Sequence, residues 1–294
     1  MSKMSRVYEK ALKHAAFKKR TDDIDMAHEH LEERSLEEDE PYKLPKRIYH
    51  TKVKIEELFG CQMVIFNENP DTERFIIYLH GGAYVNEILT LHIEFCDKLA
   101  KKANATVIAP IYPLAPNHTY KETYEIVEKL YSDVLKRNKP IAMMGDSAGG
   151  GLSAAFCEYL AYGDLPQPQH LILLSPWVDV SMSGDYDEYR DIDPMLGVDG
   201  AREMGKAWAG DLDLKDYRIS PMFGDMMSLP QTTLFVGTHE ILYPDVVEFY
   251  NRLKGSGVNV ELIIGREMTH VYPVYPGVPE SKEALNQIVD ILLG

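Results

Sequence analysis

From about residue 50 onward, short apolar runs alternate with longer amphipathic segments, and this alternation limits the folds open to the chain. The apolar runs predict strands at residues 51–58, 62–66, 74–79, 106–109, 140–144, 170–174, 232–236 and 258–264, and the amphipathic segments predict helices at residues 90–104, 121–137, 152–160, 245–253 and 280–293. Strands without polar alternation are buried on both faces, as in parallel sheets covered by helices. The sequence therefore predicts an α/β chain with a mostly parallel sheet and helices on both faces.

Two regions depart from this rhythm. Residues 1–20 are basic and residues 21–40 strongly acidic, and they predict one or two surface helices. Residues 176–220 are rich in Asp, Gly, Met and Tyr, and only residues 200–209 have a clear helical pattern. Long excursions between strands are typical of lids and binding loops. We therefore expect this region to border a functional site.

One glycine-rich stretch joins a predicted strand to a predicted helix. Residues 145–151 read Gly-Asp-Ser-Ala-Gly-Gly-Gly, which contains the Gly-x-Ser-x-Gly pattern around Ser147. In a nucleophile elbow, this pattern exposes a serine hydroxyl at the N-terminus of a helix. The same sequence pattern is also compatible with an ordinary tight turn. A phosphate-binding P-loop is disfavoured, because no Lys-Ser or Lys-Thr pair follows the glycines.

A second glycine pair follows the strand predicted at residues 74–79. His80, Gly81, Gly82 and Ala83 would let backbone N–H groups point into a cavity instead of into the sheet. An oxyanion hole needs such donors, and its other N–H comes from the residue after the nucleophile, here Ala148. The alternative is a plain glycine turn. Its place after a core strand and upstream of the Ser147 turn favours the oxyanion hole.

A serine nucleophile needs a histidine base and a carboxylate, in the chain order serine, acid, histidine. Among ten histidines, His270 follows a late strand and meets this requirement. Glu240 and Asp245 both follow the strand at residues 232–236. We favour Glu240, which comes sooner in the loop, because Asp245 is well placed to cap the next helix. Asp245 remains the alternative acid, and Asp146 is expected to bond to nearby loops.

Charge and cysteine content restrict the partners. The formal charge of −15 argues against nucleic acid and anionic membrane surfaces as partners. No apolar run approaches the ~20 residues that span a bilayer, so no membrane span is expected. The three cysteines (Cys61, Cys96, Cys157) lack metal-ligand spacing, and their odd number argues against a disulfide framework. A cytoplasmic protein is expected.

Together these motifs resemble the hormone-sensitive-lipase-like group of α/β-hydrolase carboxylesterases. The resemblance extends over residues 50–294 and includes Ser-Pro-Trp-Val-Asp at residues 175–179 and Tyr-Pro-Leu-Ala-Pro at residues 112–116. It implies an eight-stranded α/β-hydrolase sheet, with N-terminal cap helices at residues 1–48 and a catalytic domain at residues 49–294 that carries a cap insertion at about 178–220. The usual acid of the family is aspartate, so Glu240 is a departure.

The resemblance also implies roles for the matching residues. Ser147 would be the nucleophile, His270 the base and Glu240 the acid, with the N–H groups of Gly82, Ala83 and Ala148 as the oxyanion hole. We expect hydrolysis of short- to medium-chain acyl esters through an acyl-enzyme, with a small-molecule ester as substrate and no metal or cofactor. The alternatives are an amidase or peptidase, a sugar-ester deacetylase, or a non-catalytic small-molecule-binding protein. A homodimer is a further expectation.

Overall fold

The computed structural model describes residues 1–13, 17–37 and 40–294. In this part of the chain one sheet has the strand order β1-β2-β4-β3-β5-β6-β7-β8. The strands are β1 (Val53–Leu58), β2 (Cys61–Phe66), β3 (Arg74–Leu79), β4 (Ala105–Pro110), β5 (Ile141–Asp146), β6 (His170–Leu174), β7 (Gln231–His239) and β8 (Val260–Thr269). β2 is antiparallel to β1 and β4, and the other neighbours are parallel. This confirms the predicted mostly parallel sheet.

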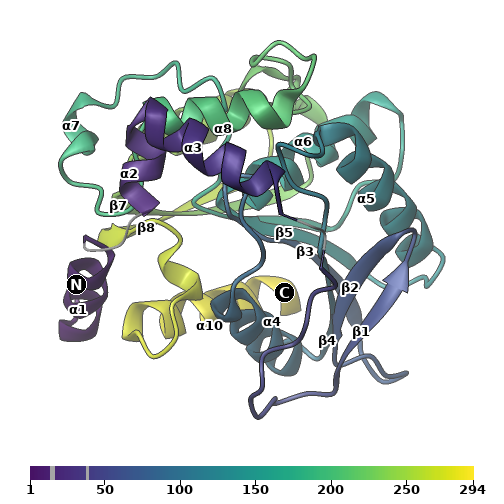
Figure 1. Ribbon diagram of the computed structural model, residues 1–294. Helices are drawn as coiled ribbons and strands as arrows, with labels where there is room; N and C mark the ends of the chain where they lie inside the picture. The colour runs from purple at the N-terminus through teal and green to yellow at the C-terminus, as the bar shows by residue number, and fades with distance from the viewer. Residues whose placement is uncertain (14–16, 38–39) are drawn as a thin grey trace.

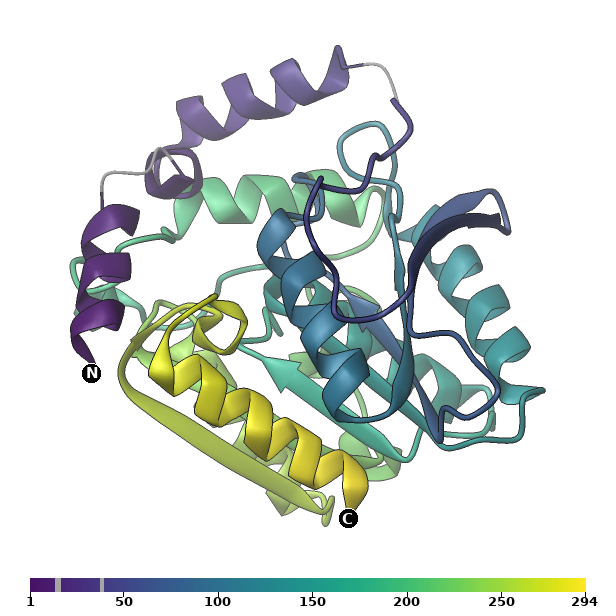
Figure 2. The same cartoon turned by 90° about the horizontal axis from the view of Figure 1, so that it is seen from below.

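Helices cover both faces of this sheet (Figures 1 and 2). α4 (Thr90–Lys102) and α10 (Pro279–Leu293) lie on one face, and α5 (Tyr120–Leu135), α6 (Ser147–Tyr162) and α9 (Tyr243–Gly255) lie on the other. In β3, Ile77 and Leu79 pack into the core under α5, α6 and α9, whereas Ile76 and Tyr78 pack under α4 and α10. Successive side chains of a strand point to opposite faces. Two buried faces therefore explain the unbroken apolar runs.

The remaining helices belong to the two regions that depart from the alternation. They are α1 (Lys3–Leu12), α2 (Phe17–Asp22), α3 (Ile24–Ser35), α7 (Asp187–Arg190) and α8 (Asp199–Ala209). α2 and α3 lie against α8, whereas α1 lies apart beside α10 (Figures 1 and 2). α8 matches the predicted helix at residues 200–209, but α7 is a single turn, too short to give a periodic signal. Residues 14–16 and 38–39 of the predicted cap lie outside the described residues.

Three boundaries that differ from the predictions position the functional loops. α6 begins at Ser147 rather than at residue 152, although glycines weaken a helix in isolation. β7 and β8 extend to His239 and Thr269, a few residues beyond their predicted ends. Glu240 and His270 consequently stand directly at the carboxyl ends of neighbouring parallel strands. Short 3₁₀ turns complete the chain at η1 (Pro221–Phe223), η2 (Met226–Ser228) and η3 (Tyr272–Val274).

Candidate active site

Ser147 stands at the turn between β5 and α6 in a conformation that serine rarely adopts. Its φ angle is 51°, in the left-handed region. The backbone of α6 closely approaches the end of β3 here: a Cβ atom added to Gly149 would lie 2.0 Å from the carbonyl oxygen of Leu79. Only glycine fits at this position. The local sequence thus allows a turn tight enough to hold the serine hydroxyl at the start of the helix.

The Ser147 hydroxyl is the first group of a hydrogen-bonded series of three side chains. These side chains follow the carboxyl ends of β5, β8 and β7. His270 Nε2 lies 2.8 Å from Ser147 Oγ, and His270 Nδ1 lies 2.5 Å from Glu240 Oε2. The imidazole and the carboxylate are buried. Because an ionised carboxylate can only accept, Nδ1 carries the proton toward Glu240, and Nε2 is free to accept from the serine. This is the geometry of a nucleophile, a base and an orienting acid.

Asp245, the alternative acid, does not touch His270. The prediction that it caps a helix is wrong, because α9 already begins at Tyr243 and its N-cap is Leu242. The Asp245 carboxylate instead accepts a hydrogen bond of 2.6 Å from the Tyr186 hydroxyl. Burial raises the pKa of Asp245 to about 7, against the opposing effect of the Tyr186 hydrogen bond. The structure therefore places Glu240, and not Asp245, against the imidazole.

Two residues to which the sequence assigned no role hold the Glu240 loop. Ser175 Oγ donates to Glu240 Oε1 at 2.7 Å and accepts from the Val271 N–H at 3.0 Å. Ser175 directly follows β6, so the rule that carboxyl ends of parallel strands meet at one edge could have identified it. Asp193 accepts from the Ile241 N–H at 2.7 Å. Asp193 comes from the 176–220 excursion, and nothing in its local sequence marks this contact.

Two of the three predicted oxyanion donors, Gly82 and Ala83, lie in the glycine loop near Ser147. Gly82 and Ala83 have φ angles of 134° and 55°, and together with Ser147 they line one cavity. Neither N–H donates to an acceptor within the described parts of the chain. Ala148 lies in the first turn of α6, where backbone N–H groups have no partner inside the helix. These donors are available to a ligand.

Asp146 ties the glycine loop to the elbow. Its carboxylate accepts from the Tyr78 hydroxyl at 2.6 Å and the Gly81 N–H at 3.0 Å, and lies 3.2 Å from His92 Nε2. Burial alone would raise the pKa of Asp146, but the charge of His92 and these hydrogen bonds outweigh burial, and the net direction is downward. Asp146 therefore bonds to nearby loops, as predicted.

A cavity of about 300 Å³ opens over Ser147. Its walls combine Leu12 and Phe17 from the N-terminal region with Met182, Met195 and Leu196 from the excursion. Among the aromatic and methionine side chains of these two regions, Phe17, Met182 and Met195 line this cavity, whereas Tyr8, Tyr186, Tyr189 and Met204 do not. The two regions that interrupt the alternation thus meet over the site.

The fold and this site define a serine hydrolase of the α/β-hydrolase type. The sequence pattern described as "alpha/beta hydrolase fold" matches residues 76–274. The chain belongs to this family, in its hormone-sensitive-lipase-like group, as the sequence motifs predicted.

The relatives of this chain include esterases. An esterase from Acinetobacter venetianus is 30% identical over 223 residues, which is 74% of each protein. The solved structure of EstE7, a hormone-sensitive-lipase homologue from a metagenome library, has a TM-score of 0.83 at 27% identity, covering 99% of this chain and 98% of that one. EstE5, solved after soaking with p-nitrophenyl butyrate, gives 0.83 at 26% over the same shares. The chain is accordingly a carboxylesterase.

Three further observations on the described residues concern membrane-spanning helices, metal ligands and disulfides. No helix within 1–13, 17–37 and 40–294 combines the length and apolar character required to cross a membrane. Over the same ranges, no three His, Cys, Asp or Glu side chains gather as metal ligands would. Cys61, Cys96 and Cys157 are buried and unpaired.

Proposed function

We propose that Ser147, His270 and Glu240 are the catalytic triad of this carboxylesterase. Ser147 attacks the acyl carbon while His270 Nε2 takes its proton, and Glu240 stabilises the imidazolium that forms. The oxyanion is held by the N–H groups of Gly82, Ala83 and Ala148. His270 then returns the proton to the leaving alcohol, and water releases the acid from the acyl-enzyme. The unbroken Ser147–His270–Glu240 hydrogen-bonded chain is the observation that supports this assignment.

We further propose that the substrates are esters with short to medium acyl chains. A cavity of about 300 Å³ is at the small end of ligand sites, and its walls are mostly apolar. Among the relatives, EstE5 was soaked with p-nitrophenyl butyrate, a four-carbon acyl ester.

A chain-length series tests this proposal. Across p-nitrophenyl esters from acetate to palmitate, kcat/KM should be highest near butyrate to octanoate and fall at least about tenfold by palmitate, because longer acyl chains do not fit a cavity of this size. A maximum at palmitate would contradict the proposal. Parallel assays with p-nitroanilides, peptides and acetylated sugars test the amidase, peptidase and deacetylase alternatives, and we expect each to be slower than butyrate ester hydrolysis.

The activity should also depend on pH in a defined direction. Burial lowers the pKa of His270, but the negative charge and hydrogen bond of Glu240 outweigh burial, and the net direction is upward. An imidazolium cannot take the serine proton, so kcat/KM should fall as the pH drops through a pKa above the usual value of about 6.5. A pH profile of kcat/KM measures this. In Glu240→Gln the midpoint of the residual activity should shift to lower pH. An unshifted midpoint would show that Glu240 does not raise the pKa of His270.

A cytoplasmic location and a homodimer stay predictions from the sequence. Cell fractionation tests the first, and light scattering of the purified protein tests the second.

A further inference from the structure

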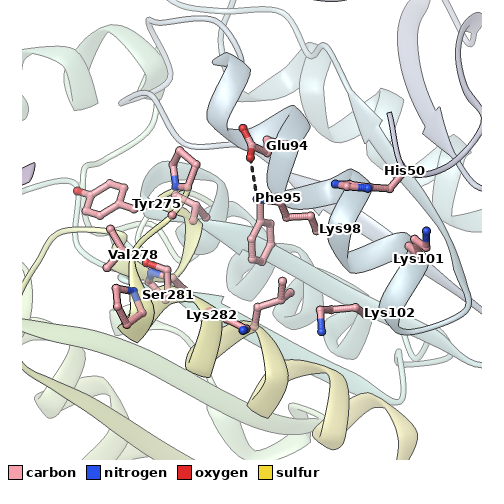
Figure 3. Close-up of a pocket in the computed structure, with 16 residues that line it drawn as sticks. His50, Glu94, Phe95, Lys98, Lys101, Lys102, Tyr275, Val278, Ser281 and Lys282 are labelled. Carbon is pink, nitrogen blue, oxygen red and sulfur yellow. Dashed lines mark hydrogen bonds and ion pairs between the residues drawn. The ribbon is translucent and has the colours of Figure 1, made fainter. Parts of the chain in front are cut away.

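A second cavity lies behind the segment that follows His270. It has a volume of about 680 Å³ and is bounded by α4, by residues 273–278 and by the first turns of α10 (Figure 3). None of the residues in the proposed triad lines it. It is larger than the cavity over Ser147, and the proposed reaction does not use it.

The walls of this second cavity suit a hydrocarbon chain. The Phe95 ring lies at its centre among the labelled side chains of Figure 3, and Val274, Val278 and Leu285 add apolar surface. Phe95 and Val278 are buried in the sheet-facing core, with 3% and 1% of their surfaces exposed. The walls are thus held by the fold. Apolar walls with a few polar groups at one end are typical of small-molecule sites.

Lysines line the second cavity, although the whole chain carries a charge of −15. Lys101 and Lys102 end α4, and Lys282 of α10 lies across from Lys102 (Figure 3). Lys102 Nζ donates to the Asn286 amide oxygen at 3.1 Å, and no carboxylate of the described residues pairs with any of the three.

The acidic side chain in the lining of the second cavity is already paired with basic residues. Among the described residues that line the second cavity, Glu94 is the only acid, and it pairs with Arg47 at 2.9 Å and with Lys98 at 2.7 Å. Unpaired ammonium groups beside an apolar wall favour a ligand with one anionic end and one apolar end.

The second cavity shares one wall with the active site. Tyr275 lines both cavities, and its hydroxyl donates to the His270 carbonyl oxygen at 2.5 Å. Tyr8 of α1 stacks on the Tyr275 ring at 5.2 Å between centroids. Tyr275 is therefore a packed partition, and a ligand in one cavity does not occupy the other.

We propose that the second cavity binds a free aliphatic carboxylate of medium chain length, with its tail against Phe95 and Leu285 and its carboxylate at Lys102 and Lys282. Acids of this class are what the hydrolysis proposed for Ser147 releases. The choice of ligand rests on that proposed function, whereas the site itself rests on the cavity and its lysines.

Calorimetric titration of the wild-type protein with octanoate tests the site. The double variant Lys102→Glu/Lys282→Glu should bind octanoate at least about tenfold more weakly, because two attractive charges become repulsive. Hexanoate should bind about tenfold more weakly than octanoate, since two CH₂ groups are no longer buried. Uncharged 1-octanol should also bind at least about tenfold more weakly.

The matched control is Lys136→Glu/Lys254→Glu, which makes the same charge change at two exposed positions, the C-cap of α5 and the last turn of α9. Octanoate binding to this control should equal that of the wild type. The proposal is overturned if the wild type does not bind octanoate, if both double variants lose affinity equally, if Lys102→Glu/Lys282→Glu binds normally, or if 1-octanol binds as well. Ester hydrolysis by Ser147 is measured separately, so failure of one proposal is distinguishable from failure of the other.

Discussion

Replacing Ser147 by alanine should lower kcat for p-nitrophenyl butyrate by about 10⁵–10⁶-fold, because the attacking oxygen is removed while the rest of the site stays in place. Alanine fits the elbow at least as easily as serine, since it has the same Cβ and no larger group. Circular dichroism and the thermal midpoint should therefore stay close to those of the wild type. The expected loss is one of chemistry and not of folding.

Ser153→Ala is the matched control for this variant. Ser153 lies on the same helix, and its hydroxyl donates to the Gly149 carbonyl at 2.7 Å, away from the cavity over Ser147. Losing one buried hydrogen bond costs about 1 kcal/mol of stability, so this control should keep activity within a few-fold of wild type. An active-site phosphonate should label the wild type and Ser153→Ala but not Ser147→Ala. Full activity in Ser147→Ala would overturn the proposed mechanism.

Replacing Glu240 by glutamine should lower kcat by about 10³–10⁴-fold. Glutamine keeps the shape of glutamate and can still accept from Ser175, so the loop has its anchor. It removes the negative charge that stabilises the imidazolium and no longer fixes the tautomer with Nδ1–H. Steady-state kinetics with p-nitrophenyl butyrate measure the effect.

Asp245→Asn is the comparison that separates the two candidate acids. Asparagine preserves the acceptor for the Tyr186 hydroxyl, and Asp245 makes no contact with His270. The loss of kcat should stay below about tenfold. If Asp245→Asn lost more activity than Glu240→Gln, the assignment of the acid would move to Asp245. Glu240→Asp tests whether the length of the acidic side chain matters. Aspartate keeps the negative charge on a shorter side chain, so this variant should be more active than Glu240→Gln.

Two features of the site depend only on local sequence. The tight turn at Ser147 needs only neighbouring residues: a strand, small side chains and a helix. The glycine loop at residues 80–83 is equally local. Both could be predicted from the sequence, and the structure brings them together because β3 and β5 are adjacent parallel strands whose carboxyl ends meet.

The identity of the acid, in contrast, depends on contacts between residues that are far apart in the sequence. Glu240 and Asp245 are five positions apart and both follow β7, so sequence spacing favours neither decisively. The outcome depends on where α9 begins and on Tyr186, which lies 59 positions away along the chain and bonds to Asp245. Ser175 likewise gains its role only because β6 lies beside β7, which places its hydroxyl between Glu240 and the Val271 N–H.

The sequence by itself therefore determined the α/β alternation, the elbow serine, the glycine loop and the late histidine. Each of these is set by periodic burial or by backbone geometry over a few residues. Only the tertiary structure decided that Glu240 contacts His270, that Asp193 holds the adjoining loop, and that Tyr275 separates two cavities. A hydrogen bond depends on atoms within about 3 Å, and for residues far apart in the chain that distance is fixed by packing of the whole fold and not by spacing along it.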